Sequence, residues 1–253
     1  MTTRVAIIGA TGKMGRLVSD LIDRTQDFEV IARLDSRSEL SEMLGADIAV
    51  DLTRPDVSRT VVDFATEHGL RVLVGTSGWG QEGIDSLARR LADRDDTGVI
   101  IIPNFSIGSV LATAFSALAA RFYDSIEIVE AHQPGKVDSP SGTAVRTAEL
   151  IGRARGKLGP VSAPHTDQRA RGQQVASVPV HSLRLAGLLA RQDVILGGTG
   201  ETLTISHNTL SPSAYESGIL LALAATRTAR GVTVGLDQIV DLGFGSDTAG
   251  ASK

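Results

Sequence analysis

The chain has 253 residues, a formal net charge of −4 at pH 7 and 42% hydrophobic residues. The length suits one large domain or two of ordinary size, and the composition is that of an ordered globular protein. The acidic balance argues against bulk binding to nucleic acid or anionic membranes. A chain without cysteine has no disulfides, thiol nucleophile or thiolate metal site. Apolar runs fall short of the roughly 20 residues that span a bilayer, and the first residues lack a signal-peptide pattern, so we expect a soluble, cytoplasmic protein.

Short apolar runs alternate with helical patterns over the first part of the chain. Strands are predicted at residues 4–8, 29–34, 47–52, 71–74 and 99–102. Between them, apolar residues recur at helical spacing, first after the glycines at 9–15, next after Pro55 and then around Ile84. Strands and helices that alternate through short connections are typical of a parallel sheet with helices on both faces. We therefore predict an α/β fold whose first domain has a Rossmann-type parallel sheet.

The pattern changes after Asn104. An alanine-rich helix is predicted at 109–122, a strand at 125–130, and a helix that has Pro140 near its start and runs to about Ala154. Segments of alternating apolar and polar residues follow at 178–185, 192–196 and 201–207. Such alternation is typical of an antiparallel or mixed sheet with one wet face. We therefore predict a second, α+β domain with a mixed sheet that begins near residue 105.

The remaining segments are shorter or more polar. A surface loop is predicted at 159–174, a helix at 213–228 and a short apolar segment at 239–242. The helix and the apolar segment could each return to the first domain, which periodicity alone does not decide. Small and polar residues from 243 onward predict a frayed tail.

A glycine-rich turn joins the first predicted strand to the first predicted helix. Gly9, Gly12 and Gly15 form G-x-x-G-x-x-G, a relative of the dinucleotide fingerprint. These glycines allow a tight turn, close approach of a pyrophosphate, and packing of helix on strand. Asp35 follows about 20 residues after Gly15, at the end of the next strand, where a carboxylate binds ribose hydroxyls. The context favours nucleotide binding over a purely structural turn.

The choice of cofactor stays open at this point. Asp35 favours NADH because a carboxylate repels the 2′-phosphate of NADPH. Lys13 and Arg37 could reach that phosphate, or they are solvated surface charges. In an open parallel sheet the carboxyl ends of strands face the ligand. Thr53 and the segments 75–77 and 102–105 lie at such ends, and are either loop punctuation or the lining of the nicotinamide site.

The densest polar cluster runs from Glu130 to Ala144, between a strand and a helix. Small residues leave the N–H groups of Gly142 and Thr143 available at the helix start, which favours a carboxylate ligand. Lys136 adds a positive charge, and His132 is a group that moves protons near neutral pH. Taken singly, each is more often structural or solvated. Together they predict a catalytic or substrate site.

Other polar residues carry weaker signals. The remaining histidines have no comparable neighbours and are expected to be structural or on the surface; they are His68, His165, His181 and His207. Ser141 invites comparison with a nucleophile, but the G-x-S-x-G pattern of hydrolases is missing from the sequence. The spacings of histidine and acidic residues match neither zinc nor calcium motifs, so we predict no metal.

Several motifs together resemble the dihydrodipicolinate reductase family, also called 4-hydroxy-tetrahydrodipicolinate reductases, of bacterial lysine and diaminopimelate biosynthesis. They are G-A-T-G-K-M-G at 9–15, G-T-S-G at 75–78, P-N-F-S-I-G at 103–108, E-A-H-Q-P-G-K-V-D-S-P-S-G-T-A at 130–144, V-P-V-H-S-L-R-L-A-G at 178–187 and G-E-T-L-T-I-S-H at 200–207. The similarity covers nearly the whole chain.

The resemblance implies a domain organisation and an assembly. Residues 1–105 with about 213–245 correspond to the dinucleotide-binding domain, and residues 106–212 to the substrate-binding domain, whose sheet builds a homotetramer. Residues 246–253 are expected to be a flexible tail. The implied reaction is NAD(P)H-dependent reduction of 4-hydroxy-tetrahydrodipicolinate to tetrahydrodipicolinate, with NADH, NADPH or both as cofactor.

The resemblance also implies roles for individual residues. His132 and Lys136 take the proton-donor positions. The cofactor-binding positions are Gly9, Ala10, Thr11, Gly12, Lys13, Met14, Asp35, Gly75, Thr76, Ser77, Ile102, Pro103, Asn104 and Phe105. The substrate-binding positions are Gln133, Ser141, Gly142 and Thr143.

The chain departs from the family pattern beside the predicted catalytic histidine. Gln133 replaces a second histidine, Pro134 and Gly135 replace a bulkier and often basic pair, and Ser77 replaces a common threonine. An amide can donate to a carboxylate but carries no positive charge. Two alternatives therefore stay open: a Rossmann reductase for another imine or keto acid, and a sensor that holds NAD(H) without turnover. The His132 and Lys136 pair counts against the sensor.

Overall fold

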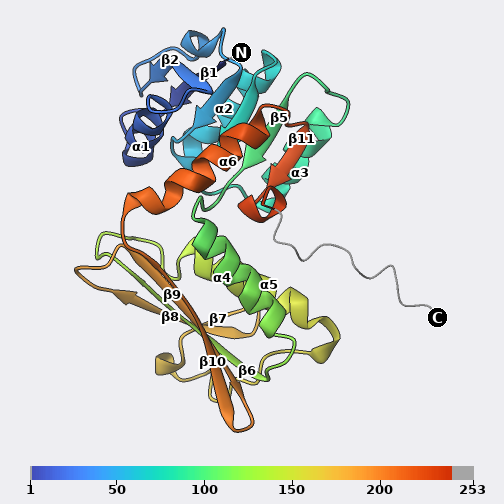
Figure 1. The fold of residues 1–253 in the computed structure, drawn as a ribbon. Coiled ribbons are helices and arrows are strands. Elements are labelled where there is room, and N and C mark those ends of the chain that lie inside the picture. The colour runs from blue at the N-terminus through green and yellow to red at the C-terminus, as the bar shows by residue number, and fades with distance from the viewer. Residues whose placement is uncertain (1, 241–253) are drawn as a thin grey trace, which may run out of the picture. The chain divides into compact units, whose positions relative to one another are not determined.

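A computed structural model describes residues 2–240, which form two compact units (Figure 1). Over the described residues, one unit is 2–105 with 215–240, and the other is Ser106–Ala214. The tail predicted at 246–253 and the last residues of the apolar segment at 239–242 lie outside the described residues. Among residues 2–240, no helix is long and apolar enough to cross a bilayer.

The first unit contains a six-stranded sheet in the order β11-β5-β4-β3-β1-β2. Its strands are β1 (Thr3–Ile8), β2 (Phe28–Leu34), β3 (Ile48–Asp51), β4 (Arg71–Val74), β5 (Gly98–Ile101) and β11 (Gly231–Val234). Every pair is parallel, which confirms the predicted Rossmann-type sheet. The order reverses between β1 and β3, so the chain has a topological switch point beside the glycine turn.

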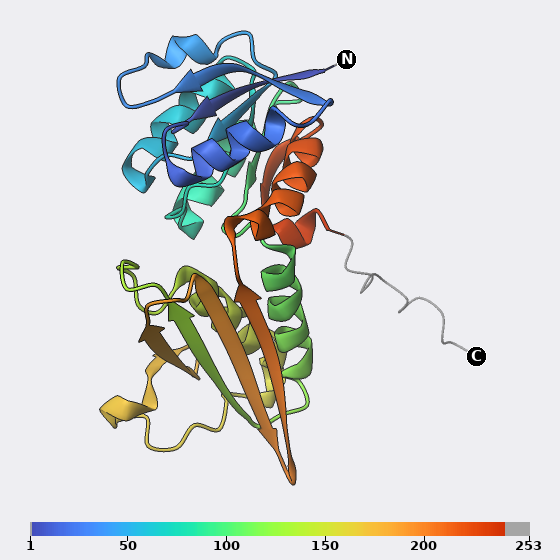
Figure 2. The same ribbon diagram turned by 60° about the vertical axis from the view of Figure 1, so that its left-hand side comes forward.

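Helices cover both faces of this sheet because right-handed crossovers run outward from β1 in both directions (Figure 2). Helix α1 (Lys13–Ile22) contacts α6 (Glu216–Thr226) on one face, while α2 (Pro55–Glu67) and α3 (Gln81–Leu91) cover the other. Strands β3 and β5 are therefore buried along their whole length. This burial explains why they have continuous apolar runs rather than alternation.

Strand β11 is an element that the sequence pattern does not predict. It has four residues, all only partly buried, and it pairs in parallel with β5 from Gly231 to Val234. Together with α6, it returns the chain to the first unit after the second unit is complete.

The second unit contains a five-stranded sheet in the order β10-β9-β6-β8-β7. Its strands are β6 (Ser125–His132), β7 (Gln173–Val175), β8 (Val178–Arg184), β9 (Ala190–Gly198) and β10 (Glu201–Thr209). Strands β6 and β8 are parallel and the other pairs are antiparallel, which confirms the predicted mixed sheet. The predicted loop at 159–174 contains a short 3-10 helix, and its last two residues, Gln173 and Gln174, belong to β7, so the prediction was wrong there.

Two helices, α4 (Ile107–Ala119) and α5 (Gly142–Arg155), pack on each other and on one face of this sheet. Ile128, Val180 and Val194 lie on that face in adjacent strands and are buried against the helices. Residues of opposite parity, such as Leu183 and Ile195, point to the other face and are 44% and 38% exposed. The sheet therefore has one covered face and one open face.

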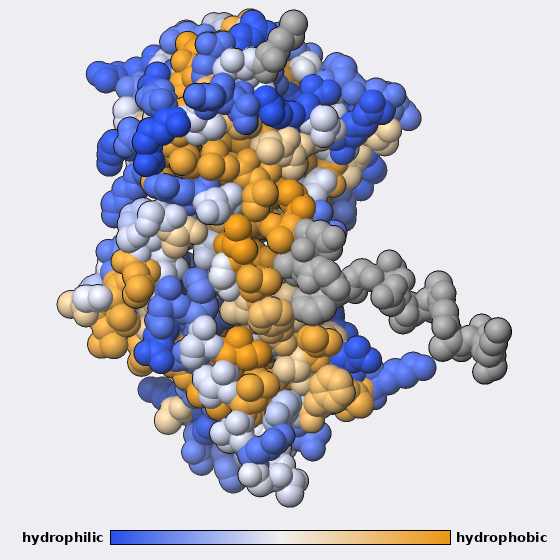
Figure 3. Space-filling model, viewed as in Figure 1, coloured by the Kyte–Doolittle hydropathy of each residue, from blue (hydrophilic) through white to orange (hydrophobic). Residues whose placement is uncertain are grey.

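The outer side of α4 is apolar as well. Phe115 and Leu118 are 43% and 45% exposed, and Phe122, three residues past the end of the helix, is 76% exposed. Figure 3 shows apolar side chains gathered over this helix. The remaining ordered segments are short 3-10 helices: η1 (Leu40–Met43), η2 (Gly156–Leu158), η3 (Arg169–Arg171), η4 (Pro212–Tyr215) and η5 (Leu236–Gln238).

Candidate active site

The glycine turn between β1 and α1 has the geometry of a phosphate cradle. Gly9 has φ +85°, and a Cβ there would lie 2.5 Å from the carbonyl oxygen of Leu52. A Cβ at Gly15 would lie 2.7 Å from Cα of Ala10, so only glycine lets the helix pack this closely. Gly12 is the N-cap of α1 and brings no side chain to the first turn. The first-turn N–H groups therefore suit an anion such as a pyrophosphate.

Asp35 lies beside this turn, directly after β2. The N–H groups of Gly9 and Ala10 both donate to the carbonyl oxygen of Leu34, at 3.0 Å each, which fixes Asp35 next to the glycines. The Arg37 N–H donates to the Asp35 carboxylate at 2.8 Å. This backbone bond, helped by the nearby Arg37 guanidinium, lowers the pKa of Asp35 although desolvation opposes the shift. The ionised carboxylate fits the hydroxyls of an adenosine ribose.

The other strand ends lie at the same edge of the sheet. A Cβ at Gly75 would lie 2.8 Å from the Phe105 ring, so the ends of β4 and β5 are in close contact. Ile102 and Phe105 are only 1% and 5% exposed, which leaves mainly their backbone to line a ligand. The more accessible predicted cofactor residues are Thr11, Gly12, Lys13, Ser77 and Pro103.

A buried network behind this edge was not indicated by the sequence. Asp51, at the end of β3, is fully buried and accepts hydrogen bonds from the hydroxyls of Ser58 and Thr53. The indole N–H of Trp79 donates to the Ser58 hydroxyl at 2.9 Å. The network anchors the segment that follows Gly75, and it gives Thr53 a structural hydrogen bond.

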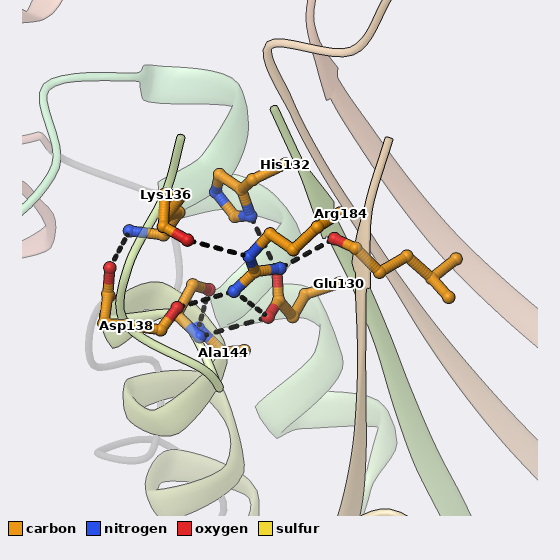
Figure 4. Close-up of polar contacts among 8 residues, drawn as sticks. Glu130, His132, Lys136, Asp138, Ala144 and Arg184 are labelled. Carbon is orange, nitrogen blue, oxygen red and sulfur yellow. Dashed lines mark hydrogen bonds and ion pairs between the residues drawn. The ribbon is translucent and has the colours of Figure 1, made fainter. Parts of the chain in front are cut away.

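In the second unit, His132 contacts a buried carboxylate, and Arg184 links that carboxylate to the backbone of Lys136 (Figure 4). Glu130, two residues before His132 on β6, is fully buried. Its Oε2 lies 2.6 Å from Nδ1 of His132. Burial alone would raise the pKa of Glu130, but hydrogen bonds from Arg184, Ser182 and His132 outweigh burial and lower it. For His132 burial dominates, and its pKa is lowered despite the neighbouring carboxylate.

Arg184 joins this carboxylate to the loop that carries Lys136. Its two terminal nitrogens lie 3.0 Å from the two carboxylate oxygens of Glu130, a fork geometry. The same guanidinium donates to the carbonyl oxygens of Lys136 at 3.3 Å and Asp138 at 2.5 Å. Lys136 Nζ in turn donates to the Asp138 carboxylate at 2.7 Å. Sequence reasoning gave no role to Glu130, Arg184 or Asp138.

The loop reaches α5 by a different route from the predicted one. The helix begins at Gly142, so Pro140 precedes the helix rather than lying in its first turn. Ser141 is the N-cap: its hydroxyl accepts from the Ala144 N–H at 3.3 Å, and it is only 2% exposed. Burial raises the pKa of Asp138, but bonds from Lys136 and the Gly142 N–H outweigh burial and lower it. The first turn of α5 therefore already holds one carboxylate, which shows that it suits anions.

The remaining polar residues lie around this centre. Gln133 is exposed, and its carbonyl oxygen accepts from the Lys136 N–H at 3.1 Å. His181 is on the other face of the sheet, 2.7 Å from Glu127. His207 Nε2 lies 3.2 Å from the hydroxyl of Ser106, which caps α4. Over the described ranges, no group of three histidine or acidic side chains could hold a metal ion.

The fold defines a class: a nucleotide-dependent oxidoreductase with a Rossmann-like unit and a second unit built on a mixed sheet. Comparison with known proteins then identifies the family. The description "Dihydrodipicolinate reductase, N-terminus" matches residues 3–105, and "Dihydrodipicolinate reductase, C-terminus" matches residues 108–240. The chain belongs to the dihydrodipicolinate reductase family and is an NAD(P)H-dependent reductase of lysine biosynthesis.

Individual relatives agree with this assignment. A 4-hydroxy-tetrahydrodipicolinate reductase of Clavibacter michiganensis is 68% identical over 242 residues, which cover 96% of this chain and 87% of the relative. The enzyme of that name from Streptomyces griseus is 45% identical and covers 94% of this chain and 98% of the relative. A dipicolinate-bound dihydrodipicolinate reductase from Paenisporosarcina sp. TG-14 has a TM-score of 0.79 at 29% identity, and covers 95% of this chain and 100% of that chain.

Proposed function

We propose that the Glu130–Ala144 segment is the substrate site at which this reductase acts on 4-hydroxy-tetrahydrodipicolinate. The observation that carries the proposal is the Arg184 guanidinium, which bonds both to the carboxylate beside His132 and to the loop carrying Lys136. It brings an imidazole, an ammonium and a helix N-terminus together in one unit. A substrate with two carboxylates needs cationic and N–H donors of this kind. The solved relative named above binds dipicolinate, a dicarboxylate.

Each residue of the site has a distinct task. The first turn of α5, with Gly142 and Thr143, binds one substrate carboxylate. The side-chain amide of Gln133 donates a hydrogen bond to the other substrate carboxylate. Lys136 leaves Asp138 and supplies the proton, because His132 is held neutral by its lowered pKa and directs Nδ1 to Glu130. A nicotinamide, when bound, supplies the hydride.

The first unit is the dinucleotide-binding domain. Gly9 to Met14 bind the pyrophosphate through backbone N–H groups, and Asp35 binds the ribose. Gly75 to Ser77 and Ile102 to Phe105 line the nicotinamide side, the buried ones through their backbone. The support is the open N-terminus of α1 and the close packing that the glycines allow. Of the segment 213–245, residues 215–240 join this domain, supported by the contacts of α6 and β11 with its sheet.

The test measures how fast the purified protein oxidises NADH and NADPH. The substrate of the reductase is made in the same cuvette from pyruvate and aspartate semialdehyde by a purified synthase. We expect loss of reduced-nicotinamide absorbance that requires the synthase. Tight NADH binding without such oxidation would contradict the substrate assignment and favour another imine or keto acid, with Gln133 as the first residue to change.

The second unit also builds a homotetramer through the open face of its sheet. Leu183 and Ile195 are exposed there, and Oδ1 of Asp193 is buried on the same face with no donor reaching it from the described residues. Ile195→Asp should give smaller species in light scattering. Leu203→Asp is the matched control, because Leu203 is also 38% exposed but lies on the helix side. Identical masses for the wild type and Ile195→Asp would contradict the proposal. We place the enzyme in the cytoplasm, as its biosynthetic family implies.

A further inference from the structure

Glu130 is the most deeply buried charged group of the second unit, and it contacts no solvent. Its carboxylate accepts from His132 at 2.6 Å, from both ends of the Arg184 fork at 3.0 Å, and from the Ser141 N–H at 3.3 Å. Removing a carboxylate from water is costly unless such donors surround it. Because Glu130 is fully buried, it cannot contact a substrate directly and acts through the residues that it contacts. We propose that Glu130 and Arg184 are positioning residues that fix the orientation of His132 and Lys136.

Glu130 sets the tautomer of His132. An ionised carboxylate accepts hydrogen bonds only, and the two nitrogens of Arg184 donate to both of its oxygens. Nδ1 of His132 must therefore carry the hydrogen, which leaves Nε2 with its lone pair. The bond also fixes the ring plane, because His132 is 16% exposed and its partner is immobile. Nε2 can then accept a proton or a substrate hydrogen bond in one defined direction.

Arg184 sets the position of Lys136. Its Nε donates to the Lys136 carbonyl oxygen, and one terminal nitrogen donates to the Asp138 carbonyl oxygen. Both ends of the short segment around Val137 are thus tied to a residue of β8. Val137 itself is 97% exposed and contributes nothing to holding the loop. The same guanidinium therefore holds the proton donor and, through Glu130, the imidazole beside it.

Strand β6 also carries a matched control residue, which points to the opposite face of the sheet. Glu127, three residues earlier on β6, accepts from Arg171 at 2.5 Å and lies 2.7 Å from His181. It is again a carboxylate between an arginine and a histidine. Glu127 and Glu130 point to opposite faces because residues alternate along a strand. A Glu127→Gln change thus repeats the chemistry of Glu130→Gln away from the substrate site.

The experiment compares Glu130→Gln, Arg184→Lys and Glu127→Gln in the full chain labelled with ¹⁵N-histidine. Histidine tautomers are observed by NMR without substrate, and kcat, KM and the pH profile are measured with substrate. The inference rests on the proposed function, but the NMR and a separate NADH-binding measurement do not need turnover. If the wild type shows the Nδ1–H tautomer at His132 but has no activity, the proposed function is contradicted. The inference about the tautomer would still hold in that case.

We expect Glu130→Gln to lose the single Nδ1–H tautomer of His132 and to lower kcat about 10–100-fold, with an altered pH profile. Arg184→Lys should keep the tautomer but raise KM, because one ammonium cannot hold both carbonyls. Glu127→Gln should leave the His132 tautomer as in the wild type. Because Glu127 lies opposite Ile195 on the open face proposed for the tetramer, its kcat serves as the control once light scattering shows the wild-type mass. Wild-type kcat and an unchanged His132 tautomer in Glu130→Gln would overturn the proposal. If Glu130→Gln does not fold, Glu130→Asp keeps the charge, withdraws the carboxylate from Nδ1 and must show the same tautomer loss.

Discussion

Lys136 is the side chain on which the proposed proton transfer depends most directly. Its Nζ donates to Asp138, which the Gly142 N–H also contacts, and its backbone carbonyl accepts from Arg184. Lys136→Ala should lower kcat about 10²–10⁴-fold, the usual contribution of a general acid. NADH binding should be retained, because the glycine turn lies in the other unit. Binding is measured by energy transfer from Trp79, the only tryptophan in the chain.

Lys157→Ala provides the control for that experiment. Lys157 is exposed in the short helix η2 of the same unit, so its loss removes one ammonium without touching the substrate site. Its kcat should equal that of the wild type. Full turnover by Lys136→Ala would exclude Lys136 as the proton donor and assign the task to His132 or water.

Asp35 is the residue that discriminates between the two nicotinamide cofactors. Its lowered pKa keeps it ionised, and a carboxylate repels a 2′-phosphate. Arg37 is 89% exposed and able to turn toward such a phosphate. Asp35→Asn should therefore raise kcat/KM for NADPH several-fold while weakening the use of NADH. Glu29→Gln, at the far end of the same strand, should change neither value. Equal cofactor ratios in wild type and Asp35→Asn would refute this assignment.

At the scale of elements, the end of α5 ties several loops of the second unit together. Arg155, in the last turn of α5, is 6% exposed and donates to the carbonyl oxygens of Ala120, Tyr123, Gly159 and Pro160. Its guanidinium thus holds together the end of α4, the turn before β6 and the loop that follows α5. Arg155→Met should lower the free energy of unfolding by roughly 2–4 kcal/mol, because several buried carbonyls lose their donor.

Arg153→Met on the same helix separates this effect from the loss of an arginine as such. Arg153 is 62% exposed and pairs with Glu149 one turn earlier. Exposed pairs of this kind contribute about 0.3–0.5 kcal/mol. Urea unfolding of the two variants measures the difference. Equal losses of stability would show that the carbonyl contacts of Arg155 contribute little.

At the same scale, the sequence pattern predicts most elements and misses those that tertiary contacts create. The apolar runs of β3, β4 and β5 are visible because burial on both faces demands them. Strand β11 is short and partly exposed, and it exists because the edge of β5 offers a partner. The start of α5 at Gly142 instead of Pro140 follows from the Ser141 cap, whose hydroxyl bond depends on the final backbone geometry.

At the scale of the whole molecule, sequence reasoning finds residues that are local and misses those that are assembled. His132, Lys136 and Gly142 fall within one segment with a recognisable motif. Arg184 lies 54 residues after Glu130 and reaches it only because β6 and β8 pair in parallel, with His132 opposite Arg184. No short sequence pattern encodes that register. The contacts of Arg184 with Glu130 and with the Lys136 loop could therefore not be predicted from the sequence, and neither could the Asp51 network in the first unit.

The groups with shifted pKa values predict how stability of the whole chain depends on pH. Burial lowers the pKa of His132 and His207 in the folded state. The unfolded chain takes up these protons near pH 6.5 while the folded chain does not, so stability decreases as pH falls below about 6.5. Burial raises the pKa of Glu127 and Glu130 in the folded state, but hydrogen bonds from arginine outweigh burial. The pKa of each carboxyl group is therefore lowered. Their contribution is complete above about pH 4.3 and is lost below it.

Thermal unfolding should therefore show two separate decreases as pH falls, one from about pH 6.5 and a steeper one below about pH 4.3. His207→Gln removes one of the two histidines and should reduce the first decrease without moving the second. Glu127→Gln should reduce the second, because a neutral amide has no proton to gain. A Tm that stays constant from pH 7 to pH 5 would show that neither histidine is held neutral by burial, and it would remove the reason for assigning the proton to Lys136 rather than to His132.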